Sequence, residues 1–355
     1  MPKNNRILQS QQVLNALITI VRPYLPLDLQ NTRITAEDII AVLGYASANR
    51  ISPDAACHEL KEAPSANRLR EVLAKALPDR ITLQRALNRI LRVQTPHFVK
   101  KGKRSYYLAI DLTLIPYHGD CYEDQNEIMR STAKSGTTHF HGYATVSIVH
   151  DNQRYVLALR FVEKGESMEN IVAWLLKRLK SMGISIRSAY LDKGFCSVPV
   201  LKTTYTFKSP KYGQLEVATV VVKKYSKGRY KRKGARWFAY AVNRLSKSIA
   251  PHQVFEMYRR RFGIETSYRQ MNQVRARTTS RNPVIRLLLV GLAFVIFNLY
   301  IAKRQHIAIC LKNPSVSVSK FWLTLRRLVR MIAQAVENLF DLADVVFRQA
   351  CFALS

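Results

Sequence analysis

Three acidic residues stand at positions where a carboxylate could do chemistry. Asp111 lies in the middle of the apolar run YYLAIDLTLIPY, Asp192 ends the run SAYLD, and Glu265 lies in FEMYRRRFGIETSYRQMNQVRAR. Burying an unpaired carboxylate is costly, and a bound metal ion offsets that cost. Carboxylates that meet from different elements therefore predict a metal site, where two Mg²⁺ ions about 3.5–4 Å apart clamp a scissile phosphate.

Each acid taken alone has a simpler interpretation. Asp111 could lie on the solvent-exposed face of an edge strand. The residues around it are apolar, however, whether their side chains would point to the same face as Asp111 or to the opposite face. Asp192 could be an ordinary acid where a strand turns, although strand ends are also where α/β sheets place their sites. Glu265 could belong to a surface ladder of ion pairs.

The Glu265 segment carries further residues suited to phosphate. Tyr258, Arg261, Glu265 and Arg269 are spaced by three, four and four residues, which makes one stripe on a helix. Glutamate can hold a metal ion there while the two arginines grip phosphates. Glu256 is nine residues before Glu265 and would point to the opposite face of the same helix.

Helical patterns fill residues 1 to about 98. Thr35, Ser52 and Ser65 are each placed to cap a helix, and Pro53 stands at a first helical position. Such a bundle could bind DNA or could be a structural cap. One helix is expected from Pro251 to about Ala276 and is the longest that the sequence predicts. An amphipathic helix is expected around residues 321–335.

Strand patterns dominate the middle of the chain. Runs at 106–117, 143–150 and 155–162 are rich in β-branched and aromatic residues, and a hairpin is expected between the last two at Asp151-Asn152. A helix at 167–181 and a short strand at 186–191 follow. The predicted order is strand, strand, strand, helix, strand.

A second predicted hairpin joins apolar runs at 215–222 and 237–242. The fourteen positions 223–236 between them hold eight basic residues, Lys231, Arg232 and Lys233 among them, interleaved with Tyr225 and Tyr230. A basic, aromatic hairpin tip suits phosphates and unstacked bases. A solvated hairpin end is the alternative.

The overall charge also favours a nucleic acid as the partner. The chain has 56 basic and 24 acidic residues and a net charge of +32. Self-repulsion of this size is offset by a polyanion such as DNA. Five scattered cysteines, with no C-x-x-C pair, indicate a reducing cytosol and argue against a zinc site or a disulfide framework. The N-terminus has no apolar signal core, and the apolar run 287–302 is too short to span a bilayer. A buried core helix, no membrane and a cytoplasmic, nucleoid-associated protein are expected.

These motifs are similar to those of a known family. The run Tyr258-x2-Arg261-x3-Glu265 resembles the signature helix of DDE insertion-sequence transposases of the insertion-sequence-four superfamily. Arg269, four residues after the glutamate, resembles the pattern of a branch that is also found in haloarchaea and cyanobacteria. AIDLT around Asp111 and YLDKGF around Asp192 match as well, so the resemblance covers roughly residues 105–300. Many relatives have lysine seven residues after the glutamate, where this chain has Asn272.

The resemblance implies a fold and a set of partners. It implies an α/β protein with an RNase H-like catalytic domain and a β-rich insertion, preceded by a helical N-terminal domain. The expected domains are a DNA-binding domain at 1–98, a catalytic domain at 99–302 with its insertion at about 203–246, and a C-terminal helical region at 303–355. It also implies Mg²⁺ or substituting Mn²⁺, terminal inverted repeats and target DNA as substrates, a homodimer in the synaptic complex, and a hairpin intermediate in many members.

The predicted function is a Mg²⁺-dependent DNA transposase that acts by cut-and-paste transposition, and two alternatives to it remain. One is an RNase H-like nuclease without strand transfer, and the other is an inactive DNA-binding remnant. Only residues 193–202 separate Asp192 from the strand-like run 203–207, whereas a parallel crossover needs about a dozen residues or more. An internal deletion after Asp192 would explain this short segment. The alternative is a compact natural variant, in which residues 203–208 supply the strand.

Overall fold

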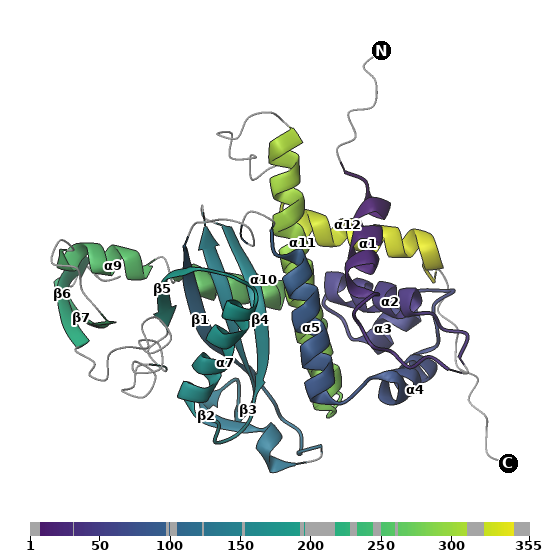
Figure 1. Ribbon diagram of the computed structural model, residues 1–355. Helices are drawn as coiled ribbons and strands as arrows, with labels where there is room; N and C mark the ends of the chain where they lie inside the picture. The colour runs from purple at the N-terminus through teal and green to yellow at the C-terminus, as the bar shows by residue number, and fades with distance from the viewer. Residues whose placement is uncertain are drawn as a thin grey trace. The chain divides into compact units, whose positions relative to one another are not determined.

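The computed structural model describes most of the chain in two compact units. The described residues are 8–30, 32–96, 99, 105–122, 124–150, 153–191, 195, 217–227, 233–243, 250–259, 262–310 and 323–343. Unit 1 combines residues Met1–Gln94 with Gln270–Ser355, and unit 2 is the intervening Thr95–Arg269. Figure 1 shows the elements of both.

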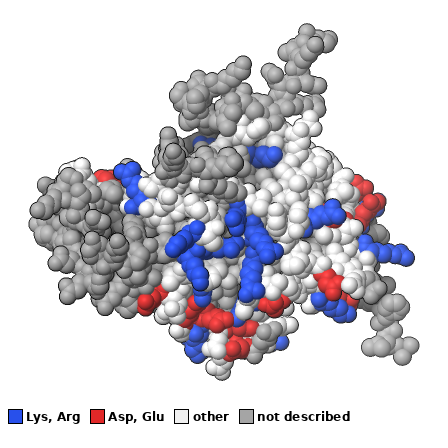
Figure 2. All heavy atoms as spheres, in the orientation of Figure 1, with Lys and Arg blue, Asp and Glu red and all other residues white. Residues whose placement is uncertain are grey.

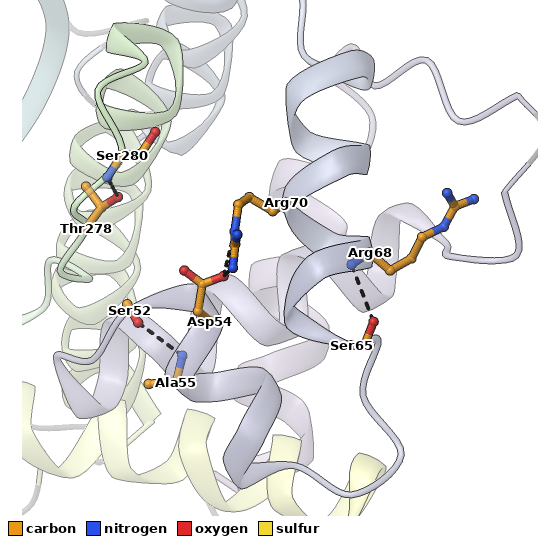
Figure 3. Close-up of polar contacts among 8 residues, drawn as sticks. All are labelled: Ser52, Asp54, Ala55, Ser65, Arg68, Arg70, Thr278 and Ser280. Carbon is orange, nitrogen blue, oxygen red and sulfur yellow. Dashed lines mark hydrogen bonds and ion pairs between the residues drawn. The ribbon is translucent and has the colours of Figure 1, made fainter. Parts of the chain in front are cut away.

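Unit 1 is helical. Its helices are α1 (Ser10–Val21), α2 (Ala36–Asn49), α3 (Pro53–Glu59), α4 (Ala66–Ala76), α5 (Arg80–Gln94), α11 (Pro283–Cys310) and α12 (Leu325–Phe340). The predicted caps are confirmed, because Thr35, Ser52 and Ser65 each accept the backbone N–H three residues on. Figure 3 shows the last two at the starts of α3 and α4. Local side-chain chemistry therefore sets where these helices begin.

The apolar helix α11 is the core of unit 1. It is the one described helix long and apolar enough to cross a membrane, and 89 % of its apolar window is buried inside the fold. It packs beside α5, and also contacts α1, α2 and α12. An added Cβ on Gly291 would lie 2.5 Å from Leu87 Cδ1, which shows how closely α5 and α11 approach. The prediction of a buried core helix is confirmed.

The compact units divide the chain differently from the predicted domains. Residues 270–302 were expected with the catalytic domain, and 303–355 were expected apart. The helices described in these two ranges, α11 and α12, both pack with the N-terminal helices. For α11 the reason is that it is apolar on every side and needs partners all around it. The DNA-binding and catalytic roles of the predicted domains stay predictions.

Unit 2 is built on a five-stranded mixed sheet. Its strands are β1 (Tyr106–Pro116), β2 (Met129–Lys134), β3 (Thr137–His150), β4 (Gln153–Val162) and β5 (Ile186–Leu191), with a short 3-10 turn, η1, at Gln125–Glu127. β3 pairs antiparallel with β1, β2 and β4, and β5 pairs parallel with the other side of β1. The predicted order of strands and helix is confirmed, with β2 as an additional strand.

Helices cover both faces of this sheet. The helix α7 (Met168–Ser181) buries Ile171, Leu175 and Leu179 and packs on β3 and β4. In Figure 1, α7 lies in front of the sheet and α10 (Phe262–Gln273) passes behind it. The sheet therefore has a helix on each face, and its central strand β1 is paired on both sides.

The basic hairpin forms, with longer strands than predicted. β6 (Val217–Lys227) pairs antiparallel with β7 (Lys233–Asn243) down to Lys227 opposite Lys233. The strands thus include many of the basic positions that were expected in the link, since a two-stranded ribbon tolerates charged side chains along its length. Lys231 and Arg232 lie outside the described residues.

The described part of the predicted long helix at 251–276 lies in two helical stretches. α9 covers Pro251–Arg259 and α10 covers Phe262–Gln273, with 260 and 261 outside the described residues. The longest described helix is instead α11, so that part of the prediction was wrong. α10 ends before 276 because Val274 and Ala276 are buried and the N–H of Arg277 bonds to the Ile51 carbonyl.

Candidate active site

Asp111 is a buried carboxylate on the central strand of the sheet. β1 has β3 on one side and β5 on the other, and the Asp111 side chain is 7 % exposed. Its Oδ1 accepts the N–H of Leu112 at 2.8 Å. The interpretation of Asp111 as a wet edge-strand residue is therefore wrong. A buried acid in an internal strand is unfavourable for folding, which favours a chemical role.

Tyr268 fastens α10 to the sheet beside this acid. Its buried hydroxyl donates to the backbone carbonyl of Asp111 at 3.0 Å and lies 2.6 Å from Thr145 Oγ1. Because the tyrosine proton goes to the carbonyl, the threonine hydroxyl donates to Tyr268. Asp111 and Thr145 are directly opposite in the β1–β3 ladder, so their side chains project to the same face, the one that α10 covers.

Glu265 lies on α10 three residues before Tyr268, which is a helix rise of about 4.5 Å. Its side chain lies outside the described residues, and so do those of most of its neighbours in the first turns of α10. The backbone of the glutamate helix is nevertheless anchored within one turn of Glu265, at the level of Asp111. This anchoring supports the predicted meeting of the two acids.

A second tyrosine fastens α9 to the end of β5. The hydroxyl of Tyr258 donates to the Leu191 carbonyl at 3.2 Å, and Leu191 lies opposite Ile110 in the parallel β1–β5 pair. Asp192 follows Leu191 directly in the chain and lies outside the described residues. Tyr258 was predicted to bind phosphate, and the structure gives its hydroxyl a backbone partner instead. Its DNA contact stays a prediction.

The hairpin of β6 and β7, which we call the basic ribbon, packs on α9. The Tyr240 ring of β7 lies 4.9 Å from the Tyr258 ring and 6.3 Å from that of Phe255, centroid to centroid. The pKa of the Tyr240 phenol is raised, mainly by burial and to a smaller extent by the neighbouring Tyr258. The aromatic contact places β6 and β7 on α9, the helix that also reaches the strand end before Asp192.

The structure thus covers the predicted site in part. Of the remaining predicted residues, Arg269 is described and exposed on α10, Lys233 is described in its backbone, and Arg261 lies outside the described residues. Within the described part of the chain, no group of three His, Cys, Asp or Glu side chains is placed to hold a metal. Whether Asp111, Asp192 and Glu265 converge stays a prediction.

Two residues of this arrangement were not expected from the sequence. Tyr268 and Thr145 are far apart in the chain and carry no metal-binding chemistry, so neither stood out. The only signal was position, since a tyrosine three residues after Glu265 lies on nearly the same side of the helix. Their contact depends on the register of two strands and could not be read from either segment alone.

Comparison with known proteins identifies the family. The sequence family described as the transposase DDE domain matches residues 103–299, which is more than half of the chain. The chain belongs to the DDE transposase family. DNA transposition is the reaction of this family, and its members generally use divalent metal ions. The particular insertion-sequence branch expected from the signature helix stays a prediction.

The DDE transposase fold is also seen in a solved relative. The chain is similar to the piggyBac transposase in a cryo-electron microscopy structure of its synaptic complex with hairpin DNA. The TM-score is 0.57 at 12 % identity, over 93 % of this chain and 80 % of that one. This likeness confirms the RNase H-like α/β fold with a helical N-terminal region. None of the curated proteins matches the sequence.

Proposed function

We propose that this transposase cuts and rejoins DNA by cut-and-paste transposition of an insertion sequence, with Asp111, Asp192 and Glu265 as its catalytic carboxylates. The observation that carries the proposal is the burial of Asp111 on the central strand. The helix that carries Glu265 is held beside it, because the Tyr268 hydroxyl donates to the backbone carbonyl of Asp111. The carbonyl of Leu191, directly before Asp192, is held in the same way by Tyr258.

The donor set fits Mg²⁺, with Mn²⁺ as a substitute. All three proposed ligands are carboxylates, and hard oxygen donors are what Mg²⁺ prefers. A divalent ion held there would activate the attacking water or 3′-hydroxyl and stabilise the leaving oxygen. The protein's own part is to hold these carboxylates in place. The sheet holds Asp111, the Tyr258 contact holds the end of β5 before Asp192, and the Tyr268 contact holds α10, which carries Glu265.

Other residues would position the DNA. Arg269 is exposed on α10 and is suited to a phosphate, as is Arg261 in the same predicted stripe. Lys231, Arg232 and Lys233 at the end of the basic ribbon would follow the DNA backbone. The N-terminal helices would bind the terminal inverted repeats, and two chains would bring two transposon ends together in a homodimer. Such a protein would work in the cytoplasm, at the nucleoid.

A nuclease and an inactive remnant remain the alternatives. The short segment after Asp192 favours the remnant, and that segment lies outside the described residues apart from Phe195. Strand transfer and end cleavage together separate all three. Pre-cut ends and, in a parallel reaction, uncut ends carrying the inverted repeats that flank the gene are incubated with supercoiled target DNA and Mg²⁺.

A transposase gives joined products, and this is the expected result. Cleavage of uncut ends without joined products would identify a nuclease. Binding of the ends without either reaction would identify a remnant. Either of the last two results contradicts the proposed function.

A further inference from the structure

The helix α5 presents a stripe of arginines to solvent. Arg85, Arg89 and Arg92 are exposed and follow one another at spacings of four and three residues. At 100° per residue these positions lie within about 60° of one another around the helix. Figure 2 shows Lys and Arg side chains gathered where α5 lies in Figure 1. We call these three residues the α5 stripe.

The opposite side of α5 is held firmly. Leu83, Leu87 and Ile90 are buried. Leu87 fits against Gly291 of α11, where an added Cβ would meet its Cδ1 at 2.5 Å. The Gln94 side-chain amide donates to the Val295 carbonyl of α11 at 2.9 Å. The stripe therefore stands on a rigid support, and its arginines lose less freedom on binding than residues of a loose tail would.

The α5 stripe differs from the basic residues of α4. On α4, Arg68 pairs with Glu71 at 3.3 Å and Arg70 pairs with Asp54 at 3.1 Å. Figure 3 shows Arg70 pointing at Asp54. By contrast, α5 contains no acidic residue, and none of the ion pairs formed among the described residues involves the stripe.

The nearest acid along the chain is Asp79, just before α5. Its carboxylate accepts the N–H groups of Ile81 and Thr82 at the start of the helix. Hydrogen bonds from Thr82 are the main cause that lowers the pKa of Asp79, and the attraction to Arg85 is the smallest. Asp79 is therefore engaged chiefly with the helix start and leaves the charge of the stripe largely uncompensated.

Three like charges on one face with no acid between them repel one another. A polyanion removes this penalty and releases its own counterions. Arg85 and Arg92 are seven residues apart, which is about 10.5 Å along the helix axis. One DNA strand carries a phosphate about every 3.4 Å along its axis, so the stripe has the length to meet up to three phosphates.

We propose that the α5 stripe binds the sugar-phosphate backbone of duplex DNA. The contact is independent of sequence, because guanidiniums that meet phosphates fix register and carry no base information. This inference rests on the proposed function, in that the DNA is the transposon end or its target. It assigns a specific face of the N-terminal helices to DNA binding.

The test is the salt dependence of duplex binding by the full chain in EDTA, which prevents cleavage. The variant R85A/R89A/R92A is expected to lose about 0.9 units of slope in log K against log salt for each phosphate that it no longer binds. The decrease should be the same for terminal-repeat and unrelated duplexes. The unfolding temperature should stay unchanged, because all three side chains are exposed.

The matched control removes the same charge from α4, as R68A/R70A/K75A. Its slope is expected to stay within one unit of the parent value, since two of these residues already pair with acids. R85K/R89K/R92K is expected to keep most of the slope, because lysine also binds a phosphate as a point charge.

An unchanged slope in R85A/R89A/R92A would overturn the proposal, and so would equal decreases in the α4 and α5 variants, which would show only a general effect of charge. Because binding is measured without cleavage, the result stands apart from the catalytic proposal. A chain that binds through α5 and never cuts contradicts only the proposed function. A chain that cuts and joins DNA with an unchanged slope in the α5 variant contradicts only this inference.

Discussion

At the scale of residues, Asp111 shows how far a local pattern reaches. An acid flanked by apolar residues in both alternating positions predicted burial, and the side chain is 7 % exposed in an internal strand. The partners that surround it were not predictable. Thr145 comes from the neighbouring strand and Tyr268 from a helix more than 150 residues away, so only the folded register brings them together.

Tyr268→Phe tests whether this contact positions the glutamate helix. The substitution keeps the ring and removes the hydroxyl, so the Asp111 carbonyl and the Thr145 hydroxyl each lose one hydrogen bond. We expect a decrease of about 1–3 kcal/mol in the free energy of unfolding. The rate of Mg²⁺-dependent DNA cleavage should fall by about tenfold to a hundredfold, while DNA affinity changes little.

Tyr45→Phe is the matched control. The Tyr45 hydroxyl donates to Glu59 at 2.9 Å within unit 1, far along the chain from the proposed catalytic residues. Its removal should lower stability by a similar amount, about 1 kcal/mol, and leave the cleavage rate unchanged. If both variants lose cleavage equally at temperatures where both are folded, Tyr268 acts only through stability.

At the scale of elements, the sequence predicted the starts of the capped helices better than the other boundaries. Thr35, Ser52 and Ser65 were identified as caps because capping depends on a few adjacent residues. The end of β6, the start of β7 and the end of α10 were misjudged. Strand length in a ribbon is set by the ladder across it, and α10 ends where Val274 and Ala276 enter the core of unit 1.

The basic ribbon gives a prediction at this scale. Replacing Lys231, Arg232 and Lys233 with alanine should lower the salt slope of DNA binding by about one unit for each phosphate that the ribbon no longer binds. The ribbon itself should persist, because its ladder continues along β6 and β7 and Tyr240 packs on α9.

The control for the ribbon variant removes an equal charge from unit 1, as R22A/K61A/K75A. Arg22 pairs with Glu37, so the slope should change little there. An unchanged slope in the ribbon variant would show that the end of the ribbon faces solvent in the complex.

Two glycines test the packing of unit 1. Alanine is favoured over glycine inside a helix by about 1 kcal/mol. At Gly44 the new methyl would meet Leu17 Cδ2 at 3.3 Å, so Gly44→Ala should be nearly neutral. At Gly291 it would lie 2.5 Å from buried Leu87, and overpacking should make Gly291→Ala less stable by about 1–3 kcal/mol. Equal melting temperatures for the two variants would show that α5 and α11 are packed more loosely than described.

At the scale of the whole molecule, the sequence indicates the order of the elements, whereas the compact units depend on contacts between distant segments. The apolar run 287–302 indicated a core helix, but it did not indicate in which compact unit this helix is buried. The helix packs with α5 and α12 in unit 1, although the transposase DDE domain runs from 103 to 299 and so includes most of α11. The residues matched by the sequence family therefore differ from the residues of unit 2, which are grouped by their contacts.

The net charge of +32 leads to a prediction about assembly. Self-repulsion disfavours association of free chains, and bound DNA removes it. At low ionic strength we expect monomers without DNA and complexes of two chains with two transposon ends when DNA is added. Sedimentation of labelled protein and DNA measures both. A stable dimer at low salt without DNA would show that charge does not control assembly.

The most direct test of the account is cleavage by Asp111→Asn. Asparagine keeps the size of the side chain and removes the charge that a divalent ion needs, so Mg²⁺-dependent cleavage of transposon ends should be abolished while DNA affinity stays close to that of the parent. Glu256→Gln, on the exposed side of α9, should cleave normally. Retained Mg²⁺-dependent cleavage in Asp111→Asn would contradict the central claim.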